Sequence, residues 1–251
     1  MAIIYKSGDI EIQDGVINNV KYLHWGNSFW PMIIYLHGLD QVGKNPIDLM
    51  TQGPFARGYN FPLQKVEGFK YPDFFNKQIQ VIAPILNSGF WEPKYLDDFM
   101  DSLGISNPLC LMGWSWGGGG TAKYLNQPVK RHNFGCGVML SMGNYSQPGV
   151  NVNCRVKLVH ATNDSRTPYQ NSDSFYAGVP AQFKDGYSKP SGGNHQAWEV
   201  FLQPSTGIYE WMKTTIPAPI ISYTPGQIEL GSDGNVYGNF NGNRIQLSLL
   251  K

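Results

Sequence analysis

The chain has 251 residues and a formal net charge of +1, and 15% of its residues are charged. About 25% is typical of globular proteins, so this near-neutral chain offers no basic stripe for phosphates and argues against nucleic acid as a partner. No apolar run reaches the ~18 residues of a membrane span, and the length suits one domain with a large core.

The first thirty residues are expected to form an antiparallel meander that leads into a larger sheet. They lack the basic start, the apolar run and the small-residue cleavage site that mark a signal peptide. We therefore expect no signal peptide in this chain. The compartment stays open between the cytoplasm and secretion with a signal outside this sequence.

Five short apolar runs, each bounded by turn-forming residues, follow at 32–38, 79–86, 108–115, 136–143 and 155–164. Such runs predict strands that are buried on both faces. Helix patterns lie between and after them, at 92–103, 119–127 and 195–215, the last with a break at Pro204 to Gly207. This alternation predicts a mostly parallel central sheet with helices on both faces, an α/β fold.

Two stretches depart from the alternation. Residues 39–78 form a long connection rich in glycine, proline and aromatic residues, and such connections are often functional. After residue 216 the turn sequences TPG, SDGN and NGN separate short runs, which is typical of β-hairpins. We expect a main domain at 1–216 and a β-rich extension at 217–251. An extension of the main sheet is favoured over a small appendage, because so few residues make a marginal domain alone.

The three cysteines are Cys110, Cys136 and Cys154. Their odd number and their spacings suggest neither a disulfide framework nor a zinc site. Cys110 and Cys136 fall in apolar runs, so buried thiols are the expected state. We expect no metal and no cofactor.

The segment Gly113-Trp114-Ser115-Trp116-Gly117 matches G-x-S-x-G, where a predicted strand ends and a predicted helix begins. In that context Ser115 is a candidate nucleophile on a strained turn, although a solvent-exposed serine in a glycine-rich turn is the alternative. The flanking glycines must be small because the turn brings them against adjoining backbone. The helix N-terminus favours developing negative charge, and Gly118 to Gly120 are expected to let the helix pack closely on the sheet.

A serine nucleophile needs a base and an acid that orients the base, in the chain order Ser, then Asp or Glu, then His. Asp164 follows an apolar run, at the strand end where such sheets bind ligands, and His195 lies on a glycine-rich loop before a helix. The other histidines fit the base less well, and His160, inside the strand ahead of Asp164, is expected to be packed. Asp173 is the alternative acid, and a turn cap is the alternative role for Asp164.

The run YLHGLD, Tyr35 to Asp40, ends a predicted strand well ahead of Ser115. This is the position from which α/β hydrolases take one backbone donor for an oxyanion. We assign that donor to the Leu39 amide and the second to the Trp116 amide, directly after the candidate nucleophile. Two such donors stabilise a tetrahedral oxyanion by about 3 kcal/mol each.

Several segments resemble the α/β-hydrolase esterases of the polyhydroxybutyrate depolymerase, feruloyl esterase and "predicted peptidase" group: IIYLHG, QGPFARG, VIAPILNSGFWEPKYLDDFM, LMGWSWGGGGTAKYL and GGNHQAWEVFLQPSTGIYEWM. The resemblance spans roughly Met32 to Lys213, and the four glycines after Ser-x are also similar to those of cutinases. It implies an α/β-hydrolase fold, serine hydrolysis of an ester and no metal. Trp116 departs from the methionine or leucine common at that place. The C-terminal hairpins lie outside the resemblance.

The substrate is expected to bind in an open cleft. Only residues 144–154 separate two of the predicted strands, too few for a lid domain. Nearby rings suit an aryl, short-chain or polymer-linked ester, although any single ring is more often core or rim packing. We place the following residues at the substrate: His37, Trp91, Trp116 and Tyr169.

The sequence thus predicts a serine carboxylesterase that acts through an acyl-enzyme on a small-molecule or polymeric ester. A serine peptidase with the same three residues is one alternative. A non-catalytic protein that binds carbohydrate or another partner on a hydrolase scaffold is the other, although such proteins usually lose one of the three residues. The oligomeric state stays open.

Overall fold

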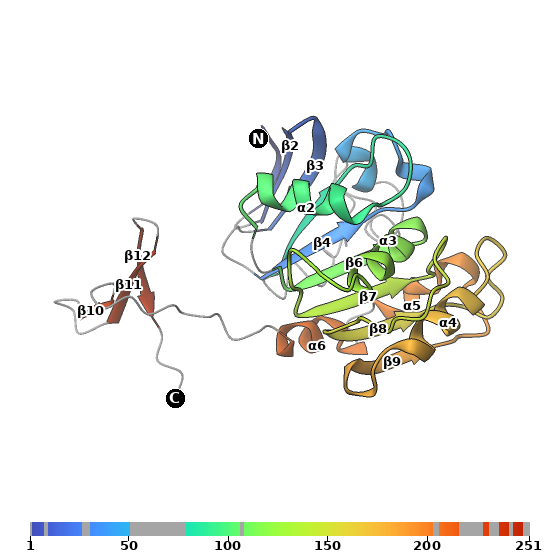
Figure 1. Ribbon diagram of the computed structural model, residues 1–251. Helices are drawn as coiled ribbons and strands as arrows, with labels where there is room; N and C mark the ends of the chain where they lie inside the picture. The colour runs from blue at the N-terminus through green and yellow to red at the C-terminus, as the bar shows by residue number, and fades with distance from the viewer. Residues whose placement is uncertain are drawn as a thin grey trace. The chain divides into compact units, whose positions relative to one another are not determined.

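The computed structural model of the chain (Figure 1) describes residues 2–7, 10–26, 31–50, 79–105, 108–202, 206–215, 228–230, 236–240 and 243–247. Most of the long connection, residues 51–78, lies outside the described residues. The chain divides into two compact units, Met1–Ile216 and Pro217–Lys251. In the described residues no helix is both long and apolar enough to cross a membrane.

The first unit is built on a nine-stranded sheet in the order β1-β2-β3-β5-β4-β6-β7-β8-β9. The strands β1 to β3 and β5 pair antiparallel, which confirms the predicted meander, and the pairs from β5 through β4 to β9 are parallel. The strands are β1 (Ala2–Ser7), β2 (Ile10–Ile17), β3 (Val20–Trp25), β4 (Met32–Leu36), β5 (Gln80–Pro84), β6 (Cys110–Trp114), β7 (Cys136–Leu140), β8 (Arg155–Val159) and β9 (Lys184–Ser188).

Helices cover both faces of this sheet (Figure 1). In β4 the side chains of Ile33 and Tyr35 pack with residues of α5 and α6, whereas Ile34 and Leu36 pack with residues of α2, α3 and α4. Because successive side chains of a strand point to opposite faces, an entirely apolar strand can serve both layers. The helices are α2 (Pro93–Ser102), α3 (Trp116–Leu125), α4 (Gln170–Gly178), α5 (Trp198–Phe201) and α6 (Ile208–Thr214).

Short 3₁₀ turns complete the unit, and two of them border the site described below. They are η1 (Leu39–Gln41), η2 (Pro46–Met50), η3 (Ala181–Phe183) and η4 (Asn194–Gln196). Between β7 and β8 the chain forms no helix, so residues 141–154 are a simple connection. The elements that follow β4, β6, β8 and β9 all begin at the carboxyl edge of the parallel strands, where open α/β sheets bind ligands.

The second unit contains a three-stranded antiparallel sheet of β10 (Ile228–Leu230), β11 (Val236–Phe240) and β12 (Asn243–Leu247). Among the described strands, none of these three pairs with the nine-stranded sheet. This corrects our preference for an extension of the main sheet. Each strand pairs instead with the next one in the chain, which short connections favour.

Candidate active site

Ser115 lies at the turn between β6 and α3 and is 8% exposed. Its backbone has φ 55° and ψ −118°, a conformation that costs energy in a residue with a Cβ. Three backbone hydrogen bonds hold it there. The Ser115 amide donates to the Leu140 carbonyl (2.9 Å), and the Ser115 carbonyl accepts from the amides of Gly119 (3.0 Å) and Gly143 (2.9 Å).

The glycines around Ser115 are required by space. A Cβ at Gly113 would lie 2.0 Å from the Gly117 carbonyl oxygen, and a Cβ at Gly117 would lie 1.9 Å from the Leu36 carbonyl oxygen. Two residues further along α3, a Cβ at Gly119 would lie 1.8 Å from the Gly143 carbonyl oxygen. At these distances the added Cβ atoms and the carbonyl oxygens would overlap. Only glycine therefore lets α3 approach the strand ends this closely.

Asp164 lies in the loop after β8, and its side chain is fully buried. Its Oδ2 lies 2.8 Å from His195 Nδ1 and 3.1 Å from His160 Nε2. Its Oδ1 accepts hydrogen bonds from the backbone amides of Arg166 (2.8 Å) and Thr167 (3.0 Å). The Thr167 hydroxyl donates to Oδ2 at 3.1 Å. Both carboxylate oxygens are therefore held by several donors.

These donors determine the charge of Asp164. Burial alone raises the pKa of this carboxyl, because the charged form loses its water. The hydrogen bonds from His160, His195 and the two amides outweigh burial and hold the pKa well below its ordinary value of 3.8. Asp164 is thus a carboxylate at neutral pH and only accepts. His195 Nδ1 must then carry a hydrogen, which leaves Nε2 of the neutral ring to accept a proton.

The loop that carries His195 is held at several points. The His195 side chain is 6% exposed, and its ring packs against Trp114 with centroids 5.4 Å apart. The Trp114 indole N–H donates to the His195 carbonyl at 3.1 Å. The neighbouring Asn194 accepts hydrogen bonds from the amide (2.8 Å) and the hydroxyl (3.1 Å) of Ser165, next to Asp164. The two loops are therefore joined to each other and to β6.

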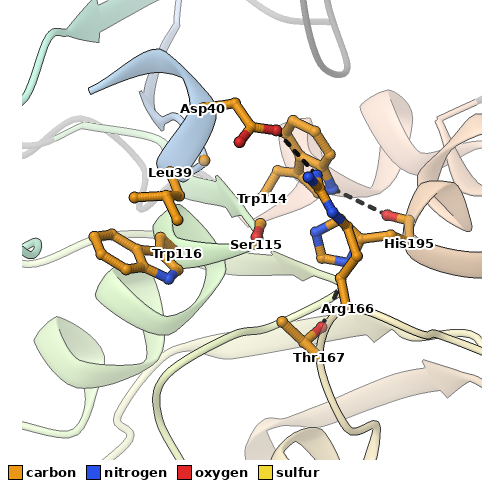
Figure 2. Close-up of a pocket in the computed structure, with 9 residues that line it drawn as sticks. Leu39, Asp40, Trp114, Ser115, Trp116, Arg166, Thr167 and His195 are labelled. Carbon is orange, nitrogen blue, oxygen red and sulfur yellow. Dashed lines mark hydrogen bonds and ion pairs between the residues drawn. The ribbon is translucent and has the colours of Figure 1, made fainter. Parts of the chain in front are cut away.

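Ser115 and His195 face one pocket of about 140 Å³. Figure 2 shows the His195 ring turned toward the serine. Among the described residues no hydrogen bond joins Ser115 Oγ to His195 Nε2, and such bonds are often long before a substrate binds. The lining consists of Gly38, Leu39, Asp40, Trp114, Ser115, Trp116, Arg166, Thr167 and His195.

Two backbone amides beside this pocket are open to a ligand. The amides of Leu39, in η1, and Trp116, at the start of α3, have no hydrogen-bond partner among the described residues. The preceding amide of Gly38 is already occupied, because it donates to Gln41 Oε1 at 3.0 Å. The free donors are thus the two that the sequence singled out as a possible oxyanion hole.

An ion pair spans the rim of the pocket. The Arg166 guanidinium donates to Asp40 Oδ2 at 2.9 Å, and the two side chains are 58% and 50% exposed. Asp40 follows Leu39 directly, and the Arg166 amide donates to Asp164. The pair therefore connects the η1 turn with the loop of Asp164, as Figure 2 shows.

Of the four residues predicted to contact substrate, Trp116 lines the pocket and three do not. His37 is fully buried: its Nδ1 donates to the Gly38 carbonyl at 2.7 Å, and its Nε2 accepts from the Leu86 amide at 3.0 Å. Burial lowers the pKa of His37 to about 4, although the bond to the Gly38 carbonyl raises it. A neutral His37 thus supports the turn before Leu39, which corrects its predicted role.

Trp91 is also a core residue and corrects the prediction in the same way. It is 1% exposed, and its indole N–H donates to the His37 carbonyl at 3.0 Å. Tyr169, at the start of α4, is half-buried and lies outside the pocket lining. Its backbone carbonyl accepts from the Tyr187 hydroxyl at 3.3 Å. The Tyr169 ring has Lys189 Nζ 5.8 Å from its centroid.

Sequence reasoning missed several residues of the site. Asp40, Arg166 and Thr167 line the pocket, although the sequence analysis gave their side chains no role. His160 was expected to be packed, and it is fully buried, but its ring also contacts Asp164. The spacing of His160 and Asp164, four residues apart across a strand end, is the signal that points to their contact.

Comparison with solved structures identifies the fold. A thermostable esterase superposes with a TM-score of 0.58 at 14% identity, over 82% of this chain and 63% of the esterase. An α/β hydrolase from a sediment metagenome of the Mar Chica lagoon gives 0.53 at 18% identity, over 80% and 98% of the two chains. The chain has the α/β-hydrolase fold.

A third structure, the acylaminoacyl peptidase of Pyrococcus horikoshii, gives a TM-score of 0.56 at 12% identity, over 87% of this chain and 44% of the peptidase. The chain thus spans less than two thirds of the thermostable esterase and of this peptidase. No protein-family model and no curated protein sequence matches it. At these identities the likeness concerns the fold alone.

Proposed function

We propose that the protein is a serine carboxylic-ester hydrolase with Ser115 as nucleophile, His195 as base and Asp164 as the acid that orients the base. The observation that carries the proposal is the shared pocket of Ser115 and His195, with the His195 ring held by Asp164 at 2.8 Å. A strained serine, a buried carboxylate and an oriented imidazole are the parts that acyl transfer needs.

The reaction follows from these positions. Ser115 Oγ attacks the ester carbonyl carbon while His195 Nε2 takes the hydroxyl proton. The tetrahedral oxyanion accepts hydrogen bonds from the Leu39 and Trp116 amides. The C–O bond to the alcohol breaks, His195 returns the proton to the leaving oxygen, and an acyl-Ser115 ester remains. Water then attacks that ester with the same base, and the acid leaves.

The lining supports esters of modest size. The pocket of about 140 Å³ has the apolar side chains of Leu39, Trp114 and Trp116 near Ser115. An aryl or short acyl group fits such walls, and a polymer-linked ester can present one such group at a time. This agrees with the resemblance to the polyhydroxybutyrate depolymerase and feruloyl esterase group. We place the whole activity in residues 1–216 and treat residues 217–251 as a β-rich C-terminal extension outside it.

The test is hydrolysis of p-nitrophenyl acetate, butyrate and octanoate by the wild type and by Ser115→Ala. We expect turnover by the wild type that falls from butyrate to octanoate, and no turnover above background by the variant. A wild type that hydrolyses none of the three contradicts the esterase proposal. It would favour a non-catalytic binding protein on this fold.

Peptide hydrolysis is the second candidate, because an acylaminoacyl peptidase is among the similar structures. The same acyl-enzyme forms from an amide, whose leaving nitrogen needs the proton from His195 more strongly. An N-acetyl amino-acid p-nitroanilide and the corresponding p-nitrophenyl ester separate the two activities. An esterase cleaves only the ester at a useful rate, whereas a peptidase cleaves both.

A further inference from the structure

His160 is a second buried histidine on the carboxylate that holds His195. It comes directly after β8, and its side chain is fully inaccessible to solvent. Its Nε2 lies 3.1 Å from Asp164 Oδ2, the oxygen that also lies 2.8 Å from His195 Nδ1. One carboxylate oxygen therefore joins two imidazole rings, and the reaction described above uses only one of them.

The other nitrogen of this ring is also held. His160 Nδ1 lies 2.8 Å from the hydroxyl of Ser172, a residue of α4 that is 1% exposed. Because the Asp164 carboxylate only accepts, His160 Nε2 carries the hydrogen between them. Nδ1 of the neutral ring then accepts from the Ser172 hydroxyl. The Ser172 hydroxyl, which can donate or accept, thus fits the tautomer that donates to Asp164.

The surroundings of the ring do not explain a histidine by packing alone. His160 Nε2 also lies 3.2 Å from the Thr167 carbonyl and 3.3 Å from its hydroxyl. An apolar side chain of similar size would fill the space. It would leave Asp164 Oδ2 with only His195 and the Thr167 hydroxyl as donors, and a buried charge that loses a donor is costly.

We infer that His160 is a positioning residue for the proposed hydrolysis: its hydrogen bond sets the rotation of the Asp164 carboxylate and stabilises its negative charge, so that Oδ2 stays directed at His195. The inference rests on the proposed function. His160 does not line the pocket. Loss of its hydrogen bond is therefore expected to lower kcat and to leave KM nearly unchanged.

A change of pH dependence distinguishes this role from simple core packing. Without this donor the negative charge of Asp164 is shared among fewer hydrogen bonds, so it attracts the proton of His195 more strongly. The base then stays protonated to higher pH, and the acid limb of kcat/KM moves upward. The titratable groups that face the ring are Asp164 and His195 on one side and, beyond Ser172, Tyr187 and Asp173.

The experiment compares His160→Leu and His160→Gln in the full chain, with Leu158→Ala as a control from the preceding strand β8 that is also fully buried. We expect His160→Leu to lower kcat about 10- to 100-fold, the loss expected for one hydrogen bond to a buried charge. Its acid limb moves to higher pH. Glutamine keeps an N–H donor and restores most of kcat. Leu158→Ala lowers the melting temperature and leaves the acid limb in place.

Two results overturn the inference. One is a His160→Leu variant with the wild-type kcat and acid limb. The other is a loss of kcat and a shifted acid limb in His160→Leu that Leu158→Ala reproduces when the two variants are compared at equal folded fraction. If the wild type hydrolyses no ester, the proposed function fails separately. His160 is then judged by ¹⁵N NMR of its ring in the full chain. The inference requires a proton on Nε2 whose signal shifts in Asp164→Asn. A proton on Nδ1, or a signal indifferent to that substitution, overturns it.

Discussion

Different interactions stabilise the elbow, which is the turn between β6 and α3 that holds Ser115, and the two loops that hold Asp164 and His195. Around the elbow, backbone atoms pack directly against backbone atoms. An added Cβ at Gly117 would lie 1.9 Å from the Leu36 carbonyl oxygen. Around Asp164, side chains and amides form a network of hydrogen bonds between 2.8 and 3.1 Å. Ser115 is thus positioned by shape, whereas Asp164 and His195 are positioned by polar contacts.

The two regions are therefore expected to tolerate different substitutions. The elbow has no room for added volume, so changes there are expected to act on folding. The loops have buried polar groups that depend on one another, so changes that keep the volume but lose a donor or an acceptor are expected to act on rate.

The largest expected effect is that of Asp164→Asn, which keeps the volume and removes the charge. We expect kcat to fall by about 10⁴-fold, because the amide no longer selects the reactive tautomer of the base. Hydrolysis of p-nitrophenyl butyrate and thermal melting measure the two consequences. Asp173→Asn is the control for the alternative acid, and it should keep nearly full activity. A loss in Asp173→Asn that equals or exceeds that of Asp164→Asn would reverse the assignment.

The next effect tests the elbow. Gly117→Ala places a Cβ against the Leu36 carbonyl, so we expect a loss of about 3 kcal/mol or more in the free energy of unfolding. Gly192→Ala is the matched control, because its Cβ would meet nothing within 4 Å. Urea unfolding of both variants gives the comparison. Equal stability of the two would show that shape does not limit the elbow.

The burial of His37, which directly follows β4, predicts that the free energy of unfolding depends on pH. Its pKa falls from the ordinary 6.5 to about 4 on folding. As the pH falls, the unfolded chain therefore takes up the proton first, and the folded state loses up to about 3 kcal/mol between pH 6.5 and 4. Urea unfolding across this range should show that decline in the wild type. In His37→Gln, which keeps a donor and an acceptor, the decline should be reduced by this amount, and an unchanged decline would contradict the account.

The smallest effect is expected at the rim. The pair of Asp40 and Arg166 is half exposed, and exposed ion pairs contribute about 0–1 kcal/mol. Asp40→Asn should therefore change the free energy of unfolding by no more than about 1 kcal/mol. It should nevertheless change KM, because the pair borders the pocket. Steady-state kinetics and urea unfolding of this variant test both points. A loss of stability as large as that of Gly117→Ala would mean that the rim, too, is essential to the fold.

The sequence allowed the fold and the meeting of Ser115, Asp164 and His195 to be predicted because each has a local signature. The apolar runs indicate a buried parallel sheet, and the ends of its strands converge at one edge. The contact of Asp40 with Arg166 joins residues 126 positions apart, and no local pattern specifies such a pair. In the sequence, a buried histidine such as His160 stands among apolar residues whether or not its ring has a polar partner in the fold. The same limit explains Trp91, whose ring was expected at the substrate and is buried in the core.

We propose that Ser115 is a nucleophile activated by His195 and Asp164. Labelling with a fluorophosphonate, followed by intact mass and peptide mapping, tests this role. We expect one adduct, on Ser115, that is absent from Ser115→Ala and forms much more slowly in Asp164→Asn. An unlabelled wild type, or an adduct on another residue, would contradict it.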